Sequence, residues 1–198
     1  METATPSTTA EWLRAQPALT GTAPPLDLAS LPDDPVETFL RWIREAVAAG
    51  VPEPQTVTLA TVDADGVPDA RSLSLKDVGP RGWAVAGRRS SVKGAQLRAN
   101  PVAAMNLWWQ PLVRAVRVRG RVEEASAEES AADLAARSAA ARADVAAGDW
   151  ALWRIVPDRV EFWQGSPDRR HLRIVYTAVD GGWRREAVRG EGDPVSLG

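Results

Sequence analysis

A basic stretch near the C-terminus holds the residues best suited to chemistry. It contains the alternating residues Arg169, His171 and Arg173, and His171 is the only histidine in the chain. If the stretch is extended, these three side chains share one face, because successive strand residues point to opposite sides. Arginine forks bind phosphate and carboxylate groups, so the pattern indicates an anion site. A solvated basic edge strand is the competing interpretation.

Two earlier stretches also carry cations. Arg71 and Lys76 fall on a predicted strand with opposite parity, which places them on opposite faces unless a bulge intervenes. The segment 87–94 follows a predicted strand, opens a helix and includes Ser91 and Lys93. Backbone N–H groups at such a helix start suit a phosphate, although the glycine spacing fits neither a dinucleotide fingerprint nor a Walker loop. The alternatives are two charges flanking a buried apolar pair and an ordinary serine cap with surface arginines.

Tryptophan is over-represented among the aromatic residues. The chain has nine tryptophans, one tyrosine and two phenylalanines. Trp108, Trp109 and Trp163 lie nearest to the basic stretches. Flat rings beside cations could frame a planar aromatic cofactor. Tryptophans more often fill cores and interfaces, and that interpretation stays open.

Composition excludes several classes of protein. A net charge of -2 gives no global basic field, so we expect no binding to nucleic acid. The absence of cysteine and the single histidine exclude thiolate chemistry and make an all-protein zinc site improbable. No apolar run approaches the roughly 20 residues of a membrane span, and residues 1–25 lack a secretory pattern. We therefore expect a cytoplasmic protein with no membrane partner.

The order of predicted elements indicates one domain. Residues 1–34 are expected to be a partly disordered arm, residues 35–189 a single domain and residues 190–198 a disordered tail. A helix is predicted to begin at Asp34-Pro35 and to end at Gly50. Further helices are predicted over 90–99 and 128–147. Strands are predicted over 55–62, 70–75, 83–86, 103–109, 116–122, 153–156, 160–163, 172–178 and 183–188.

Most of these strands are joined by tight turns, which favours antiparallel pairing. The predicted fold class is mainly β with flanking helices, arranged as a closed or partly closed antiparallel barrel.

Taken in order, the stretches resemble the pyridoxamine/pyridoxine 5′-phosphate oxidase family of FMN-binding split β-barrels, which includes the related phenazine-biosynthesis oxidases. The resemblance covers roughly residues 34–188. Its most specific part is the sequence EFWQG at 161–165 followed by Arg169-x-His171-x-Arg173. The strand at 71–76 and the helix start at 91–101 also match.

The resemblance implies FMN as cofactor, a small planar or phosphorylated substrate, dioxygen as electron acceptor and a homodimer that shares its flavin sites. In the implied mechanism, substrate transfers hydride to the flavin. Arg169 and His171 would be catalytic and, with Lys76 and Arg137, would bind substrate. The implied FMN-binding residues are Arg71, Ser72, Leu73, Ser74, Leu75, Lys76, Ser91, Lys93, Trp163 and Arg173.

The chain departs from the family pattern at several positions. Val92 replaces an arginine of the phosphate site, for which Arg88 and Arg89 are the candidate substitutes, and Ala115 replaces a flavin-binding glutamine. Asp133 and Ala141 replace a tyrosine and a serine of the substrate site. A flavin-capping segment before Trp150 is missing. The flavin site is therefore better supported than the vitamin substrate.

Three functions remain open at this point. The first is oxidation of pyridoxamine or pyridoxine 5′-phosphate to pyridoxal 5′-phosphate. The second is a flavin-dependent oxidase or reductase for another planar substrate in secondary metabolism, of the phenazine type. The third is a non-catalytic split barrel that binds flavin or haem.

Overall fold

A computed structural model describes residues 8–190 and 192–196. The strands are β1 (Thr56–Val62), β2 (Pro68–Ser74), β3 (Asp77–Gly79), β4 (Gly82–Arg88), β5 (Val102–Trp109), β6 (Arg114–Glu124), β7 (Trp150–Gln164), β8 (Leu172–Val179), β9 (Gly182–Arg189) and β10 (Asp193–Pro194). The helices are α1 (Thr9–Arg14), α2 (Pro35–Ala48), α3 (Val92–Ala99), α4 (Ala127–Ala135) and α5 (Ala139–Arg142), with a 3-10 turn at Gln110–Leu112.

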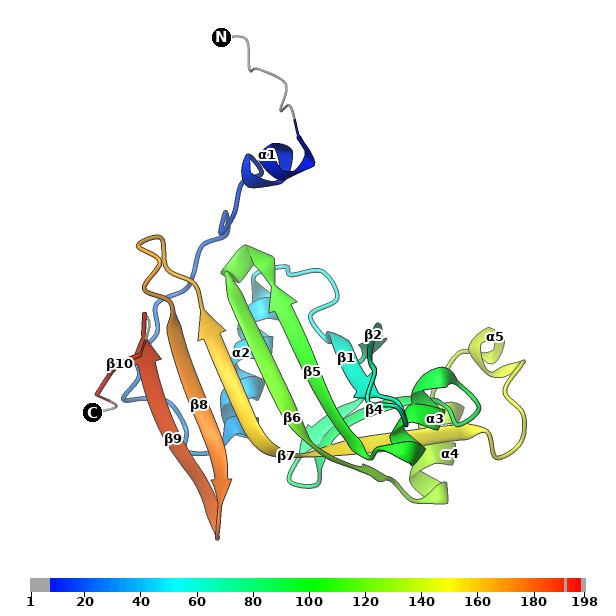
Figure 1. Cartoon of the computed structure of the whole chain (residues 1–198). Helices are drawn as coiled ribbons and strands as arrows, with labels where there is room; N and C mark the ends of the chain where they lie inside the picture. The colour runs from blue at the N-terminus through cyan, green and yellow to red at the C-terminus, as the bar shows by residue number, and fades with distance from the viewer. Residues whose placement is uncertain (1–7, 191, 197–198) are drawn as a thin grey trace.

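The strands form one antiparallel sheet in the order β10-β9-β8-β7-β6-β5-β1-β2, and β4 joins it by pairing with β7 and β3. The sheet curls on itself, so that β4 closes over the core beside α2 (Figure 1). The prediction of a mainly β, antiparallel split barrel with flanking helices is confirmed.

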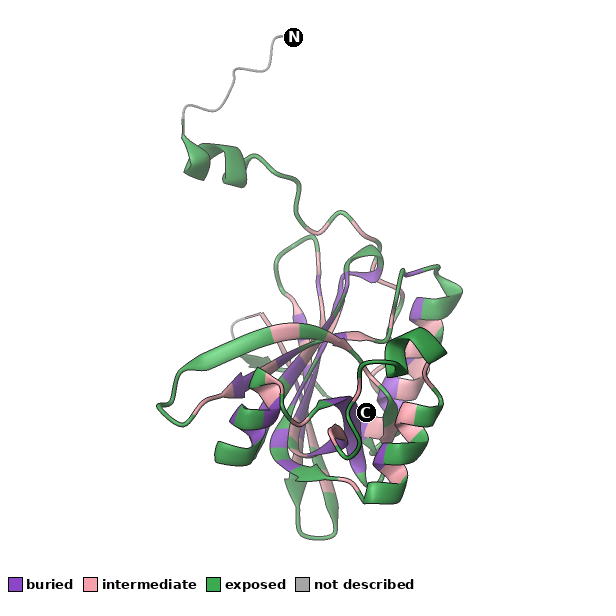
Figure 2. Ribbon diagram, turned by 90° about the vertical axis from the view of Figure 1, so that its right-hand side faces the viewer, coloured by how far each residue is buried: buried purple, intermediate pink, exposed green. Residues whose placement is uncertain are grey.

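Helix α2 covers the core because its sequence has both a start signal and an apolar stripe. The Asp34 side chain accepts the Val36 N–H at 2.7 Å, and Pro35 occupies the first turn. Phe39 and Trp42 are fully buried, and Figure 2 shows the buried stripe along the side of the helix that faces the sheet. Truncating either ring to alanine should cost about 3–5 kcal/mol.

Strand β7 runs through both parts of the sheet. The sequence predicted two strands, at 153–156 and 160–163, but the structure has one strand of 15 residues. The register against β6 shifts after Arg119, where Asp158 is an extra, unpaired residue. This bulge lets the chain bend without breaking the strand, and Gly120 makes it possible because a side chain there would collide with the Val156 carbonyl.

Strand β7 therefore belongs to two parts of the sheet. Its first half pairs with β4, whereas its second half pairs with β8, and β6 runs along both. Figure 1 shows its two ends at opposite sides of the molecule.

The Ala-rich segment differs from its prediction. A single helix was expected over 128–147, but α4 ends at Ala135 and the short α5 follows. Ser138 caps α5 by accepting the Ala141 N–H, and a side-chain cap of this kind starts a new helix rather than continuing the old one. The break leaves Arg137 in the connection, beside β7.

The two ends of the chain also carry local structure. α1 has no buried residue and stands away from the sheet (Figures 1 and 2). Thr22 anchors the arm by donating its N–H to the Pro111 carbonyl at 2.9 Å. The tail was expected to be disordered, yet Asp193 and Pro194 pair with β9. The arm residues 1–7 and tail residues 191, 197 and 198 lie outside the described part.

Candidate active site

A pocket of about 560 Å³ lies at the Trp150 end of β7, where β7 pairs with β4. It is bounded by β2, α3 and the α4–α5 connection. Four basic side chains line it, together with hydroxyl groups from β2 and α3. Its lining residues are Glu53, Thr56, Ser72, Leu73, Ser74, Lys76, Ala86, Gly87, Arg88, Ser91, Lys93, Arg137 and Trp150. Glu53 and Trp150 were not anticipated from sequence. The pairing of β4 with β7 brings Trp150 here, whereas Glu53 comes from the loop before β1.

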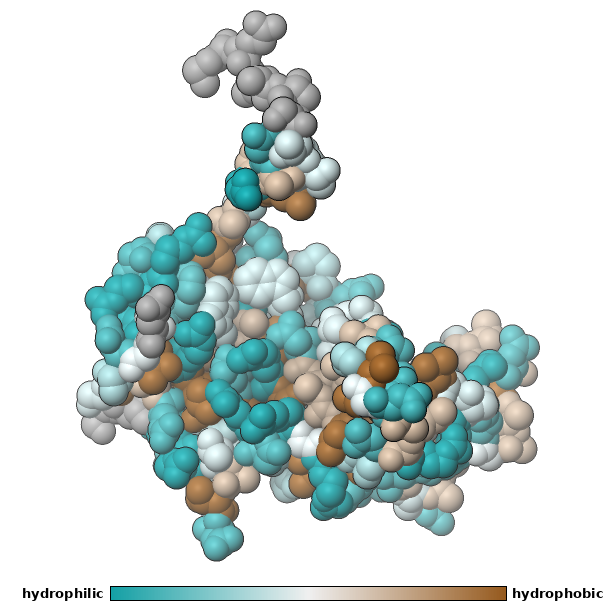
Figure 3. All heavy atoms as spheres, in the orientation of Figure 1, coloured by the Kyte–Doolittle hydropathy of each residue, from teal (hydrophilic) through white to brown (hydrophobic). Residues whose placement is uncertain are grey.

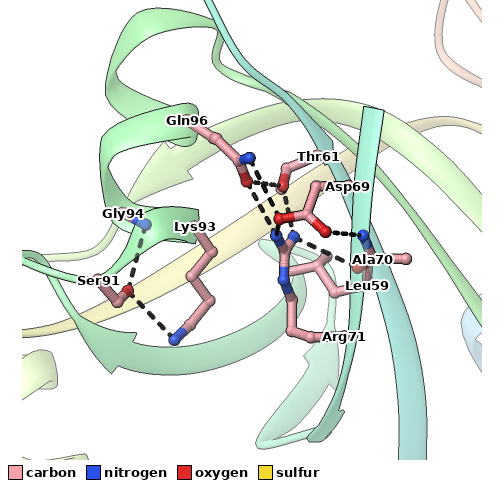
Figure 4. A network of polar contacts seen from close by, with 9 residues as sticks. All are labelled: Leu59, Thr61, Asp69, Ala70, Arg71, Ser91, Lys93, Gly94 and Gln96. Carbon is pink, nitrogen blue, oxygen red and sulfur yellow. Dashed lines mark hydrogen bonds and ion pairs between the residues drawn. The ribbon is translucent and has the colours of Figure 1, made fainter. Parts of the chain in front are cut away.

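The start of α3 places Lys93 in this pocket. Ser91 caps the helix by accepting the Gly94 N–H at 3.3 Å, and it also accepts a hydrogen bond from Lys93 Nζ at 3.3 Å (Figure 4). The Lys93 side chain crosses Gly87, where any side chain would collide with its ammonium group. Burial, and secondarily the positive charge of Arg71, lower the pKa of Lys93. An anion bound here would relieve both costs.

Arg71 reaches from β2 into a network of polar side chains that includes Gln96 of α3. Its guanidinium donates hydrogen bonds to Thr61, to Asp69 at 2.7 Å and to Gln96 at 2.9 Å (Figure 4). Arg71 faces this network and Lys76 lines the pocket, but β2 ends at Ser74, so alternation along one strand does not relate the two residues as the sequence predicted. A role for Arg71 in binding FMN remains a prediction.

The two arginines considered as substitutes for the missing ligand at Val92 have different surroundings. Arg88 is exposed and lines the pocket. Arg89 instead pairs with Glu124 at 2.6 Å and donates to the Trp150 carbonyl at 2.6 Å. Of the two, only Arg88 is placed to contact a molecule in the pocket.

The opposite wall of the pocket combines two cations, a ring and an acid. The Arg137 guanidinium lies 4.7 Å from the centre of the Trp150 ring. Trp150 Nε1 donates to the Asp133 carboxylate at 2.8 Å, and Lys76 Nζ lies 4.0 Å from the same carboxylate. No local pattern predicts the Asp133–Trp150 contact, since the two residues are 17 positions apart in separate elements.

An aromatic cluster occupies the other end of β7. The Trp163 ring lies 4.9 Å from the His171 ring and 5.9 Å from the Trp108 ring. Ala115 lies opposite both tryptophans in the β-sheet register, so its small side chain leaves room for the two rings. Trp108 remains 46% exposed, and its ring is available to a further molecule.

His171 is oriented by the turn that precedes β8. The Ser166 backbone N–H donates to His171 Nδ1 at 3.0 Å, so the neutral ring carries its proton on Nε2. Burial lowers the pKa of His171, and the positive charges of Arg169 and Arg173 lower it further. The imidazole is thus a neutral hydrogen-bond donor at neutral pH.

The predicted single face for Arg169, His171 and Arg173 is wrong. Arg169 has a φ of 64° and belongs to a turn in which its N–H donates to the Ser166 carbonyl at 3.0 Å. β8 begins only at Leu172, so of the three only Arg173 lies in the strand. Two carboxylate contacts of Asp168, to Ser166 and to the Arg170 N–H, shape this turn.

Within one copy of the chain, the pocket and the aromatic cluster remain apart. No described residue between Trp163 and Arg173 lines the pocket. Trp150 and Trp163 are 13 residues apart on β7, a span of roughly 40 Å in an extended strand. Lys93 and Arg173 therefore do not share a cleft within a single chain.

The antiparallel sheet and its flanking helices define the fold class of the protein as a split β-barrel. Residues 43–164 match the family model described as pyridoxamine 5′-phosphate oxidase, and residues 150–188 match the pyridoxine 5′-phosphate oxidase C-terminal dimerisation region. The chain belongs to the pyridoxamine 5′-phosphate oxidase family, and it is an oxidoreductase of that family.

Relatives with this name occur in several bacteria. The chain is 40% identical to pyridoxine/pyridoxamine 5′-phosphate oxidase of Burkholderia multivorans, over 80% of this chain and 90% of the relative. It is 38% identical to the enzyme of the same name from Neisseria meningitidis, over 79% of this chain and 89% of the relative.

Two solved structures share the fold. PhzG from Burkholderia lata, crystallised with tetrahydrophenazine-1-carboxylic acid, superposes with a TM-score of 0.78 at 21% identity, covering 85% of this chain and all of PhzG. A pyridoxamine 5′-phosphate oxidase-related FMN-binding protein from Nostoc punctiforme has a TM-score of 0.66 at 18% identity, covering 80% and 98% of the two chains. At these identities, the likeness supports the fold alone.

The described residues contain no helix long and apolar enough to cross a membrane. Among the same residues, no group of three or more His, Cys, Asp or Glu side chains could hold a metal ion.

Proposed function

We propose that the protein is an FMN-dependent oxidase of a planar ring substrate. The observation that carries the proposal is the α3 end of the pocket. There the Lys93 ammonium group and the first turn of α3 lie near the Arg71 guanidinium. Arg71 is paired with Asp69 at 2.7 Å, whereas Lys93 forms no ion pair among the described residues. Such a site suits a phosphate, and the adjoining pocket of about 560 Å³ has room for a ring beside it.

The residues present fit FMN. Lys93, Ser91 and Arg88 would hold its phosphate, and the hydroxyls of Ser72 and Ser74 lie along the same pocket. Leu73 on β2 and Leu75 just after it pack against the core and would support the strand on which the cofactor lies. When bound, FMN supplies a two-electron acceptor for hydride.

The aromatic cluster would bind the reacting molecule. Trp163 presents a ring face, and His171 presents a donor at Nε2 because Nδ1 is occupied by the Ser166 N–H. Arg169 is exposed at the tip of the turn and carries a permanent positive charge. In this proposal, His171 and Arg169 orient the substrate by donating hydrogen bonds, and Arg173 binds FMN.

A homodimer follows from this division of roles. The two groups lie at opposite ends of β7, so one complete site would take the cationic pocket from one copy and the aromatic cluster from the other. The match of residues 150–188 to a dimerisation region supports this arrangement. Apolar residues lie among hydrophilic ones on the exposed face of the sheet (Figure 3), where residues from β1, β5, β6 and β7 line a hollow of about 290 Å³.

Two substrates are candidates. The names of the relatives support pyridoxamine or pyridoxine 5′-phosphate, oxidised to pyridoxal 5′-phosphate with dioxygen as electron acceptor. A phenazine-type planar substrate is the second candidate. It is favoured by Asp133, which brings a negative charge into the wall that contains Lys76 and Arg137.

The test is to purify the protein with FMN and to add each substrate without oxygen. We expect a yellow protein whose flavin absorbance is bleached by its substrate and restored, with peroxide release, by air. A protein that takes up no FMN would refute the proposal. Bleaching by pyridoxamine 5′-phosphate would select the first candidate, and bleaching by a dihydrophenazine carboxylate alone would select the second.

A further inference from the structure

The acid Asp133 stands behind the wall of a pocket that is otherwise rich in positive charge. Its side chain is 14% exposed, and its position is fixed by the hydrogen bond from Trp150 Nε1 at 2.8 Å. The only cation that pairs with it among the described residues is Lys76, at 4.0 Å and 26% exposed. A carboxylate so placed acts on any molecule that approaches Lys76.

This acid makes the two walls of the pocket electrostatically different. On the α3 wall, neither Lys93 nor Arg88 forms an ion pair among the described residues, although Asp149 interacts with Arg88 electrostatically from a longer distance. On the α4 wall, Asp133 lies near Lys76 and Arg137. The net charge of this group of three is therefore one unit lower than that of the two cations alone. Glu53 adds another carboxylate at the mouth, where it accepts a hydrogen bond from Thr56 at 3.2 Å.

Arg137 has the geometry of a carboxylate-binding residue. Its guanidinium lines the pocket and lies over the Trp150 ring, which fixes the plane of its donors. Its Nε atom is buried, so the two terminal nitrogens are the donors left for a ligand. A planar fork of this kind pairs with a planar carboxylate through two parallel hydrogen bonds.

A structural role alone does not account for Asp133. The Trp150 N–H needs an acceptor, and an uncharged amide or hydroxyl oxygen would serve it equally well. The carboxylate additionally places a full negative charge next to Lys76, behind the wall of the pocket.

We propose that Asp133 determines substrate specificity by selecting, at the Lys76–Arg137 wall, a ring that carries a single carboxylate and by rejecting a phosphate monoester. This inference rests on the proposed function and narrows its substrate class to planar ring carboxylates. A phosphate monoester carries about two negative charges near neutral pH, so Asp133 repels it more strongly than a monoanion.

The experiment compares two probes that share one ring and differ in their anionic group, 1-naphthoate and 1-naphthyl phosphate. Their dissociation constants are measured on the FMN-loaded protein at about pH 8 by perturbation of the flavin absorbance. We expect the wild-type protein to bind the carboxylate about tenfold more tightly than the phosphate monoester. Asp133→Asn keeps an oxygen for the Trp150 N–H and should reduce that preference about tenfold by tightening phosphate binding.

Asp180→Asn is the matched control, because it removes the same unit of charge from the exposed turn between β8 and β9 and should leave the preference unchanged. Asp133→Ser repeats the test with a smaller side chain if the amide disturbs the packing against Trp150.

The possible outcomes separate this inference from the proposed function. A flavin-loaded protein that prefers 1-naphthyl phosphate, binds neither probe or keeps its preference in both Asp133 variants would overturn the inference alone. A protein that takes up no FMN would overturn both. A preference that shifts toward phosphate in the Asp133 variants, but not in Asp180→Asn, supports the inference.

Discussion

The two ends of β7 carry two different kinds of site. At the Trp150 end, four cations line a pocket, and burial and Arg71 lower the pKa of Lys93. At the Trp163 end, rings and a neutral imidazole are arranged around a turn that contains the left-handed residue Arg169. The first end is built to bind an anion, whereas the second is built to face a ring.

This comparison has a structural consequence. A strand of 15 residues holds the two ends too far apart for one molecule of cofactor size to touch both within one copy. Strand β7 therefore acts as a rigid spacer, and the proposed active site takes its residues from two chains. The predictions below test that division, beginning with the largest expected effect.

Replacing Lys93 by alanine should weaken FMN binding about 100-fold, because a charge-assisted hydrogen bond to phosphate is lost inside a partly buried site. FMN titration of the flavin-free protein measures the dissociation constant. Arg98→Ala is the control, since Arg98 is an exposed cation in the last turn of the same helix. Equal FMN affinity in the two variants would show that the α3 end does not bind the cofactor phosphate.

Replacing Arg169 by alanine should lower kcat about 30-fold while FMN affinity stays unchanged, because this side chain is proposed to contact only the substrate. Anaerobic flavin reduction by the substrate provides the rate. The neighbouring Arg170 pairs with Asp193 at 2.9 Å, so Arg170→Ala changes the charge of the same turn and should retain turnover. Loss of FMN with retained turnover in Arg169→Ala would reverse the assigned roles of the two ends.

Replacing Arg71 by alanine should reduce the free energy of unfolding by about 1–3 kcal/mol, because Thr61 and Gln96 are buried and lose a donor. Chemical denaturation measures this change. Arg121→Ala removes an exposed cation that pairs with Glu123 and should cost under about 1 kcal/mol. Similar losses in both variants would mean that the Arg71 network contributes little to the fold.

The pH dependence should follow His171. Its pKa is lowered by burial and by Arg169 and Arg173, and the neutral ring is the form that accepts the Ser166 N–H. Activity should therefore be present at neutral pH and fall only on acidification below the ordinary histidine pKa of about 6.5. Arg169→Gln removes a neighbouring positive charge, so the acid limb of kcat/KM should move to higher pH. An acid limb that stays in place in this variant would contradict the assignment.

Local signals in the sequence were sufficient for much of the fold. The start of α2 follows from Asp34 and Pro35, because capping depends on adjacent residues alone. The continuity of β7 was missed because the bulge depends on Gly120, which lies more than 30 residues earlier in the chain. The break between α4 and α5 was missed because Ala-rich sequence favours helix throughout, and a single serine cap overrides it.

The sequence predicted the residue types of the candidate site but not how those residues are arranged in space. The resemblance supplied Lys93 and His171, yet the alternation of residues placed Arg169 on a strand that does not form there. The role of Asp133 follows only from its contacts with Trp150 and Lys76, which are tertiary. Spacing in a sequence cannot indicate such contacts, because they depend on how separate elements pack.

The central claim is that each active site combines the cationic pocket of one chain with the aromatic turn of another. Mixing Lys93→Ala and Arg169→Ala chains by co-expression tests it most directly, because a mixed dimer would contain one site with both halves intact. The account predicts about a quarter of wild-type turnover from such a mixture, since about half of the dimers are mixed and each has one intact site. Turnover no higher than the average of the two separate variants would contradict it.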